Sequence, residues 1–571
     1  MRCEQALAAD PAHADSLHLM GLLSLQSQQY DHAVEWISRA IQQNPKPGYL
    51  VSLGTALRRQ GRHDEALQVY DKAIQLKPDD GQLWKKLGEA LIDLGRRPDA
   101  LLAFQHVLKL DPHDWHAAAL CGILLNEMGR PEQALGCLDG YLALGRPLQA
   151  HQVLVSETRA IALHRLNRIE EAAAENRRLL ALDPENAEAC NNLAAALQLL
   201  GRDAEASEWL DRAIRLRPDY FDALINKAAS LQQLHRFDEA AAVYGRLKAI
   251  APDAAEPGLN LALLQLLRGD FESGWAGREV RWQLPSAYPK LDKPMWTGDS
   301  DIAGRTILIG PDEGLGDTIQ MARYAPMLAA RGARVVLVVQ DPLHPIFSDL
   351  PGVAQCLPTG TKGLPPFDLH CPVMSLPLAF GTRLDSIPPL PPLWPRPALA
   401  RVEAWRDRLD HRLGRGARPR IGLVWSGSSG HKNDHNRSMP LRTLCRILDV
   451  DADFVSLQKD PNPADQAILR ERTDIVDLTS DLTDFGQTLA LLSCLDLVIT
   501  VDTSVAHLAA SLGLPTWIML PYLPDFRWLL DRDDSPWYPT VRLFRQGETR
   551  DYGEVLDRVR NELVALRAPH R

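Results

Sequence analysis

The sequence lacks the features that mark membrane proteins, disulfide-rich proteins and general nucleic-acid binders. No stretch approaches the roughly 20 apolar residues that span a bilayer, and the first residues lack the apolar core of a secretory signal. The eight cysteines are scattered without a C-x-x-C pair, so we expect reduced thiols and no zinc site. A formal net charge of −10 argues against a nucleic-acid partner, although a local basic pocket is allowed. Together these absences predict a cytoplasmic protein.

Two series of small residues repeat through the first half of the chain. A phrase of the type Gly-Arg-x-x-Glu-Ala occurs, for example, at Gly61–Ala66 and Gly201–Ala206. Its alanine returns every 33 or 34 residues, with one step of 38, at Ala33, Ala66, Ala100, Ala134, Ala172, Ala206 and Ala240. A second small residue returns at the same spacing, at Gly21, Gly54, Gly88, Gly122, Ala160, Ala194 and Ala228. The period assigns the first half of this 571-residue chain to a repeat array.

Each repeat has the pattern of a helical hairpin. Small residues let two helices approach closely, the Gly-Arg pair occupies the turn, and a proline such as Pro78, Pro112 or Pro184 ends the second helix. The pattern resembles the tetratricopeptide family over residues 1–268, which implies an α-solenoid superhelix. Residues 1–11 resemble the second helix of a repeat that starts upstream, and we expect an irregular repeat near residues 140–151.

The concave face of such a superhelix suits an extended peptide or another protein. Asn191, Asn192 and Asn226 fall in first helices, which line that face, and could bind the backbone of an acceptor protein. Alternatively, these side chains are solvated or form hydrogen bonds within the array.

After residue 268 the period stops and the pattern becomes that of βαβ units. We expect a closing helix and linker at 269–299, then two doubly wound lobes at 300–395 and 396–571, joined by a proline-rich hinge. The predicted strands are Thr306–Gly310, Val335–Gln340, Phe367–His370, Ile421–Trp425, Phe454–Leu457, Leu497–Val501 and Thr516–Leu520. Two such lobes place a ligand cleft at the carboxyl ends of their strands.

The first lobe opens with a strand, a glycine-rich turn and a helix that begins with an acid, in Gly314-Leu315-Gly316-Asp317. Gly314 and Gly316 would allow a ligand to approach the backbone, and a helix N-terminus is positive. Asp317 could take a proton from an attacking hydroxyl. It could equally be an ordinary helix cap.

A polar segment from Ser426 to Ser438 follows a predicted strand of the second lobe. Its Lys432 and Arg437 could neutralise the charge of a phosphate, although an exposed polar loop is the alternative.

A second polar sequence, Asp502-Thr503-Ser504, ends a buried strand and begins a helix. The hydroxyls of Thr503 and Ser504, with the free amides of the helix start, suit a diphosphate. His507 follows on the first or second turn and could add a hydrogen-bond donor or a positive charge. A lone helical histidine is usually structural, which is the alternative, but the polar strand end before it favours a function.

The order and spacing of these motifs resemble the heptosyltransferase-type glycosyltransferases over about residues 300–550. The resemblance implies a two-lobed GT-B fold and an inverting, metal-independent transfer from a nucleotide-diphosphate sugar. It assigns Asp317 as catalytic base and Arg437 or Lys432 as the phosphate-binding cation. It also matches Asp502, Thr503 and His507 to donor-site residues and suggests a donor contact at Gln458. From the motifs themselves we add Gly314, Gly316, Ser426 and Ser504 to the predicted donor and phosphate site.

The chain departs from this family at two positions. The family commonly has glycine after Asp-Thr, where this chain has Ser504, and an acidic donor contact where this chain has Gln458. The sugar is therefore not predicted. A D-x-D string at Asp451-Ala452-Asp453 precedes a strand of the second lobe and is interpreted as a surface turn, so no metal or other cofactor is expected.

The repeats and the transferase-like lobes together predict a glycosyltransferase that uses a nucleotide sugar and modifies a protein recruited by the repeats. A second hypothesis keeps this chemistry but has a lipid or polysaccharide acceptor. A third is a non-catalytic scaffold whose second half only binds a nucleotide sugar.

Overall fold

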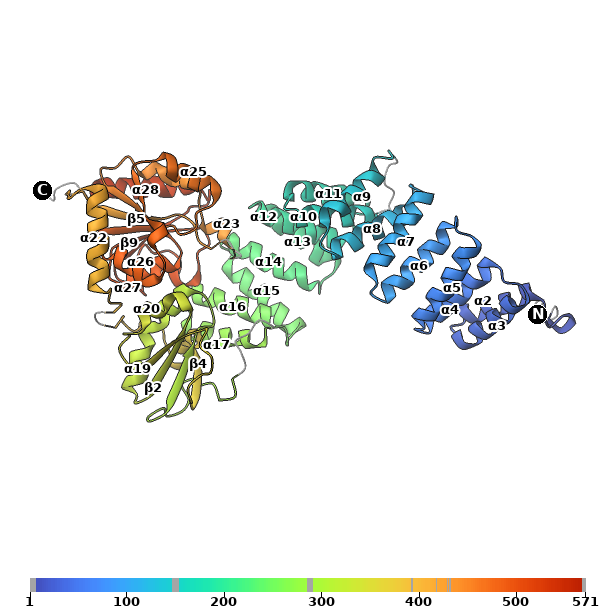
Figure 1. Ribbon diagram of the computed structural model, residues 1–571, viewed down its shortest axis with the longest axis horizontal. Coiled ribbons are helices and arrows are strands. Elements are labelled where there is room, and N and C mark those ends of the chain that lie inside the picture. The colour runs from blue at the N-terminus through green and yellow to red at the C-terminus, as the bar shows by residue number, and fades with distance from the viewer. Residues whose placement is uncertain are drawn as a thin grey trace. The chain divides into compact units, whose positions relative to one another are not determined.

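The computed structural model describes residues 7–145, 153–284, 291–391, 394–416, 418–428, 430 and 433–566. The chain divides into two compact units between Leu234 and His235 (Figure 1). This division falls before residue 268, where the sequence pattern placed the end of the repeats, and the domain boundaries drawn from the sequence stay a prediction.

The first unit is an array of helical hairpins, in which each helix packs on the next (Figure 1). Its named helices are α2 (Ala14–Gln26), α3 (Tyr30–Gln43), α4 (Pro47–Arg59), α5 (His63–Leu76), α6 (Gly81–Asp93), α7 (Arg97–Leu110), α8 (Trp115–Glu127), α9 (Pro131–Leu142), α10 (Val153–Arg165), α11 (Ile169–Leu182), α12 (Ala187–Leu199), α13 (Asp203–Leu216) and α14 (Phe221–Gln233). The tetratricopeptide-type solenoid predicted from the period is confirmed. Most of the expected irregular repeat, residues 146–152, lies outside the described residues.

The small residues of the first helices make the hairpins possible. A Cβ atom on Gly54 of α4 would lie 2.5 Å from the ring of Tyr70 of α5, and one on Gly88 of α6 would lie 2.7 Å from the ring of Phe104 of α7. Such distances are well inside van der Waals contact, so the large side chain of the second helix fills the space that a larger residue would need. The glycine and the ring sixteen positions later thus form one packing unit.

The turn between the helices of a hairpin requires a left-handed backbone conformation. Gly61, Gly95 and Gly201 have φ values of +77°, +69° and +71° there. Asn167 and His235 adopt φ values of +57° and +55° at the equivalent position without being glycine. The predicted Gly-Arg turn is therefore confirmed, and these two repeats form it with asparagine and histidine, which adopt this conformation more often than most other non-glycine residues.

The second unit begins with helices that continue the helical pattern but join a different core. They are α15 (Phe237–Ile250), α16 (Ala255–Leu267), α17 (Phe271–Arg278) and the 3₁₀ helix η2 (Glu279–Gln283). Phe271 and Trp275 of α17 share one buried hydrophobic cluster with both α/β lobes. Trp275 packs edge-on against Phe526 and Trp537 of the second lobe. The predicted closing helix is therefore a structural part of the α/β unit.

The first lobe contains a parallel sheet in the order β3-β2-β1-β4. Its strands are β1 (Thr306–Gly310), β2 (Arg334–Val339), β3 (Val353–Pro358) and β4 (Leu369–Pro372). Its helices are α18 (Leu315–Met321), η3 (Ala322–Tyr324), α19 (Ala325–Ala330), η4 (Asp341–Leu343), α20 (His344–Phe347), η5 (Val373–Ser375) and α21 (Leu376–Ala379). The direction of the strand order reverses between β1 and β4.

The second lobe contains a parallel sheet in the order β10-β9-β8-β5-β6-β7. Its strands are β5 (Arg420–Val424), β6 (Asp453–Ser456), β7 (Ile475–Asp477), β8 (Leu497–Val501), β9 (Thr516–Leu520) and β10 (Val541–Arg545). Its helices are α22 (Leu399–Leu413), α23 (Asp434–Arg437), α24 (Leu441–Leu444), η6 (Cys445–Ile447), α25 (Pro463–Glu471), η7 (Thr479–Asp481), α26 (Phe485–Leu492), α27 (Ser504–Ser511), η8 (Phe526–Trp528) and α28 (Tyr552–Ala565). Here the order reverses between β5 and β8. Both sheets are consistent with Rossmann-like domains.

The sequence predicted the central strands and missed strands at the sheet edges. β1, β8 and β9 have the predicted bounds, whereas β3, β7 and β10 were not predicted. Buried central strands have continuous apolar runs. The missed strands are an edge strand with exposed side chains, a strand of three residues, and a strand that alternates apolar with arginine residues. At the edge of a sheet these strands lack the continuous apolar run on which the prediction depended.

Candidate active site

Asp317 caps the first helix of the first lobe. The backbone N–H of Gly314 donates a 2.7 Å hydrogen bond to Oδ2 of Asp317, which caps the start of α18. Such a bond satisfies a backbone donor that a helix start leaves unpaired. The cap, which was the alternative to a catalytic base, is thus present, and it engages one of the two carboxylate oxygens.

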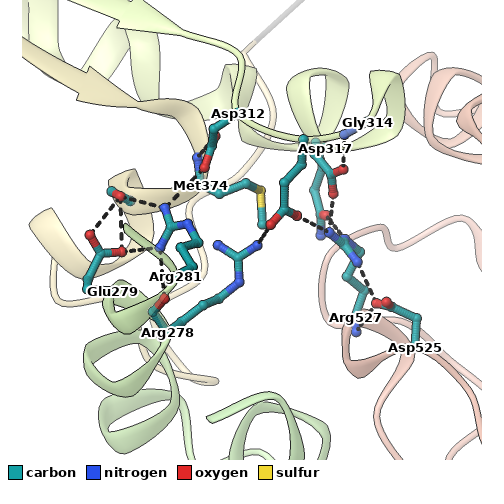
Figure 2. A network of polar contacts seen from close by, with 12 residues as sticks. Arg278, Glu279, Arg281, Asp312, Gly314, Asp317, Met374, Asp525 and Arg527 are labelled. Atoms are coloured by element: carbon teal, nitrogen blue, oxygen red, sulfur yellow. Dashed lines mark hydrogen bonds and ion pairs between the residues drawn. The ribbon is translucent and has the colours of Figure 1, made fainter. Parts of the chain in front are cut away.

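Asp312 joins the two strands at which the order of the first sheet reverses. Its Oδ1 accepts the backbone N–H of Met374 at 3.0 Å, and its Oδ2 accepts a hydrogen bond from Arg281 at 3.1 Å (Figure 2). Met374 follows β4 and Asp312 follows β1, so the carboxylate bridges the carboxyl ends of both strands. Burial raises the pKa of Asp312, while the Arg281 guanidinium acts to lower it.

Two arginines reach this edge from the closing helix. Arg278 of α17 forms an ion pair with Glu313, and Arg281 of η2 donates to Oγ of Ser375 at 2.7 Å (Figure 2). Only 2% of Arg278 is exposed, and its Nε and Nη1 have no hydrogen-bond partner among the described residues. Burial lowers the pKa of Arg278 and raises the pKa of Glu313. The helix that follows the repeats therefore contributes positive charge beside the predicted site.

Arg527 connects the two lobes. It lies in η8 of the second lobe and forms an ion pair with Oδ1 of Asp317 in the first (Figure 2). It also donates to Asp525 at 2.6 Å and, through Nε, to Oε1 of Gln320 at 3.0 Å. A carboxylate oxygen of Glu313 lies 3.8 Å away. The guanidinium is buried among acidic groups that raise its pKa far above the ordinary value against the opposing effect of burial.

Arg437 bridges the reversal point of the second sheet. Its Nη1 donates to the backbone carbonyl of Asp502 at 3.1 Å, and its Nε donates to Asp434 at 3.2 Å. Asp502 follows β8 and the Arg437 segment follows β5, and these strands are neighbours. Thr503 is the N-cap of α27, and Ser504 is its first residue. One cation and one helix N-terminus thus meet at the position where open α/β sheets bind ligands.

Burial shifts the pKa of two residues behind this edge. It raises the pKa of Asp502 to about 6, with a further upward contribution from Asp525 that Arg527 opposes. His507 is buried, and its Nδ1 lies 3.0 Å from the hydroxyl of Tyr538. Burial, and next the Arg527 guanidinium, lower the pKa of His507 to about 3. The imidazole is therefore neutral at neutral pH, which corrects the positive charge considered from the sequence.

Gln458 faces the backbone of the neighbouring strand. It is 5% exposed, and its Oε1 accepts the N–H groups of Trp425 at 3.2 Å and Ser426 at 3.0 Å. The side chain thus ties the end of β6 to the end of β5, and its expected donor contact stays a prediction. Beside it, an open cavity of about 540 Å³ is lined by residues at the ends of β6 and β7, among them Lys459 and Thr479.

Comparisons with known families divide the chain in the same way. Residues 54–95 match the TPR repeat family, residues 85–150 and 158–221 match the tetratricopeptide repeat family, and residues 1–73 match anaphase-promoting complex, cyclosome, subunit 3. Residues 458–518 match glycosyltransferase family 9 (heptosyltransferase), and this segment includes Asp502 and His507. The C-terminal end carries a heptosyltransferase-like domain.

Similar proteins cover part of the chain. Protein FlbA of Caulobacter vibrioides is 27% identical over 328 residues, which are 52% of this chain and 53% of FlbA, so the chain spans about half the length of this curated relative. A tetratricopeptide repeat protein of Parabacteroides merdae is 17% identical, with a TM-score of 0.35, over 44% of this chain and 99% of that chain. PilF of Pseudomonas aeruginosa is 17% identical, with a TM-score of 0.33, over 38% and 97% of the two chains.

The structure brings together most of the predicted residues of the heptosyltransferase-like domain. Gly314, Gly316 and Asp317 start α18, which packs on α27 with its Ser504 and His507. Lys432 lies outside the described residues. Among the described residues, no group of three or more His, Cys, Asp or Glu could hold a metal ion. No described helix is long and apolar enough to cross a membrane.

The asparagines of the repeats contact each other. Nδ2 of Asn226 in α14 donates to Oδ1 of Asn191 in α12 at 2.9 Å, and the backbone carbonyl of Asn226 accepts from Gln198 at 2.7 Å. Asn191 is buried and Asn192 is half-buried. Hydrogen bonding within the array, the alternative considered above, is therefore found for Asn191 and Asn226. Their binding of an acceptor stays a prediction.

The sequence analysis identified Arg437 but not the other arginines of the site, Arg278, Arg281 and Arg527. Arg278 lies between Trp275 and Trp282 in the sequence, and Arg527 lies between Phe526 and Trp528. A charged residue embedded in a buried aromatic segment needs a partner, because an unpaired buried charge is strongly unfavourable. That local pattern could have indicated that Arg278 and Arg527 are buried and paired. It does not show which acidic residue pairs with each arginine.

Proposed function

We propose that this protein is a glycosyltransferase that moves a sugar from a nucleotide-diphosphate sugar to an acceptor hydroxyl. The observation that carries the proposal is the position of Arg437, which joins the carboxyl ends of β5 and β8 beside the N-terminus of α27. A diphosphate needs positive charge and several hydrogen-bond donors, and this position offers both. The family 9 match over residues 458–518 supports the same assignment.

In this proposal the two lobes have separate tasks within a GT-B arrangement. Arg437 and the amides of Thr503 and Ser504 hold the diphosphate on the second lobe. Asp317 on the first lobe accepts the proton of the acceptor hydroxyl, whose oxygen attacks the anomeric carbon as the bond to the diphosphate breaks. Attack opposite the leaving group inverts the anomeric centre. Arginine and helix amides neutralise the leaving diphosphate, so the reaction is proposed to need no metal.

The repeats are proposed to recruit a protein acceptor, because an α-solenoid offers an extended surface for a peptide or a folded partner. A lipid or polysaccharide acceptor would use the same chemistry. One observation favours the third hypothesis, a non-catalytic scaffold: both oxygens of Asp317 are engaged, by Gly314 and by Arg527. Donor hydrolysis in the absence of an acceptor separates a transferase from a scaffold.

The test is thermal stabilisation of the purified chain by UDP-, GDP-, ADP- and CMP-sugars in metal-free buffer. CMP-sugars contain a single phosphate and serve as the chemical control. We expect stabilisation by one diphosphate class, which is lost in Arg437→Ala and kept in Arg442→Ala. Arg442 is an exposed arginine on the nearby helix α24, so its removal matches the change in charge. Stabilisation that is equal in both variants would refute the assigned donor site.

A further inference from the structure

Arg527 contacts acidic groups from both lobes. It pairs with Asp317 of the first lobe and with Asp525 of its own lobe, and Glu313 lies 3.8 Å away. Its Nε is fixed by Oε1 of Gln320. One buried cation is therefore shared by carboxylates that would repel one another without it.

The pairing engages the carboxylate that is proposed to act as the base. Oδ1 of Asp317 accepts a hydrogen bond from Arg527, and Oδ2 accepts the N–H of Gly314. A general base must direct a lone pair at the proton it removes, within hydrogen-bond reach. Each carboxylate oxygen has two lone pairs, so Asp317 can accept a further hydrogen bond while both partners stay. Departure of Arg527, whose side chain can move more readily than the backbone of Gly314, would leave Oδ1 wholly to the acceptor hydroxyl.

Arg527 is also close to the proposed diphosphate position. α18, which begins beside Gly314, packs against α27, whose N-terminus is the proposed phosphate-binding element. Arg527 lies near enough to Asp502, one residue before the N-cap of α27, for the two charges to interact. A diphosphate at that N-terminus would add negative charge near Arg527.

We propose that Arg527 is a positioning residue that exchanges Asp317 for the donor diphosphate. In the free protein the guanidinium is held by Asp317; when a diphosphate binds to the second lobe, the guanidinium moves to it and leaves Oδ1 of Asp317 free for the acceptor hydroxyl. Oδ1 of the base is then free of Arg527 only after the donor is bound. This inference rests on the proposed function of the same site.

The exchange makes Asp317 a competitor of the diphosphate for one arginine. Removal of the competitor should therefore strengthen diphosphate binding, and only while Arg527 is present. The measurement is calorimetric titration of the full chain with inorganic pyrophosphate, and with UDP, GDP and ADP, in metal-free buffer. The variants are Asp317→Asn, Arg527→Gln and the double variant Asp317→Asn/Arg527→Gln. Arg532→Gln, which removes a surface ion pair with Asp534, is the matched control.

We expect Asp317→Asn to lower the Kd several-fold and Arg527→Gln to raise it by about tenfold or more, since Arg527→Gln removes charge-assisted hydrogen bonds. The double variant should bind like Arg527→Gln, and Arg532→Gln should bind like the wild type. Arg527→Lys keeps the charge on a narrower headgroup and should recover part of the affinity. If Arg527→Gln does not fold, the variants Arg527→Lys and Asp317→Asn still test the exchange.

Two results would overturn the exchange while the donor site stands. In the first, Asp317→Asn leaves the Kd unchanged or raises it, so Asp317 does not compete for Arg527. In the second, Asp317→Asn strengthens binding equally in the Arg527→Gln background, so simple charge repulsion accounts for the effect. If the wild-type chain binds neither pyrophosphate nor any nucleoside diphosphate, the proposed donor site and the exchange both fail.

Discussion

Gly316 of the first lobe lies directly against His507 of the second. A Cβ atom on Gly316 would stand 2.7 Å from Cδ2 of the imidazole, inside van der Waals contact. The contact joins α18 to α27, the two helices whose N-termini carry Asp317 and Ser504. The glycine of the Gly-Leu-Gly-Asp motif thus allows the lobes to approach each other.

Gly316→Ala should push the lobes apart at this point. We expect a loss of about 1–3 kcal/mol in the free energy of unfolding, as for other overpacked sites, together with weaker nucleoside diphosphate binding. Urea denaturation followed by tryptophan fluorescence measures the first effect and calorimetry the second.

His507→Ala removes the clashing ring, so the double variant should lose less than the sum of the two single variants. Gly245→Ala is the control, because Gly245 lies in α15 with no neighbour within 4 Å of an added Cβ. Additive losses in the double variant would show that the two residues do not restrict each other.

Gly88→Ala should destabilise the repeat array by the same mechanism. An added Cβ would lie 2.7 Å from the ring of Phe104, so we expect a loss of about 1–3 kcal/mol in thermal or chemical unfolding. Phe104→Leu in the same chain should recover part of that loss by making room. Gly136→Ala, in α9 with no neighbour within 4 Å of an added Cβ, should be neutral or stabilising. An equal loss in Gly136→Ala would refute the packing explanation.

His507 should make the second unit sensitive to acid. Burial lowers the pKa of its imidazole in the folded protein from 6.5 to about 3. A depressed pKa contributes stability above pH 6.5 that is lost as the pH falls towards 3, because only the unfolded chain then binds the proton. Each pH unit below 6.5 lowers the free energy of unfolding by about 1.4 kcal/mol.

The corresponding measurement compares the wild type with His507→Gln in urea at pH 7.5 and pH 5. The wild type should lose about 2 kcal/mol more than the variant over this interval. His435→Gln, which changes an exposed histidine of the same lobe, is the control and should follow the wild type. The same pH dependence in wild type and His507→Gln would contradict a buried neutral imidazole.

Arg437 should dominate the affinity for the diphosphate. Its Nη1 donates to the carbonyl of Asp502, so the guanidinium is already oriented before the ligand binds. Replacement by glutamine removes this oriented positive charge. We expect the Kd of nucleoside diphosphates to rise about 10- to 100-fold, as for the loss of a charge-assisted hydrogen bond. Arg437→Lys should recover only part of the affinity, and Arg442→Gln should change little. Calorimetry at two salt concentrations would check that the effect is electrostatic.

Much of the fold was predictable because its signals are local. Each such signal lies within one short stretch of sequence. Examples are the small residues Gly54 and Gly88 and the apolar runs of β1 and β8. The edge strands β3, β7 and β10 were missed because exposure on one side removes their apolar continuity. For the site, Asp317 and Arg437 were named in advance, whereas the hydrogen bonds that tie Gln458 to the backbone of Trp425 and Ser426 were not.

By itself the sequence determined the repeat solenoid, the two α/β lobes and the strand ends that carry Asp317, Arg437 and Asp502, because spacing and hydrophobic runs act between neighbours in the chain. Only the tertiary structure decided the charge state of His507 and the partner of Asp317. Burial sets the first, and the second is Arg527, 210 residues farther along the chain. An ion pair over such a separation depends on how two lobes pack, and no local pattern of residues specifies that packing.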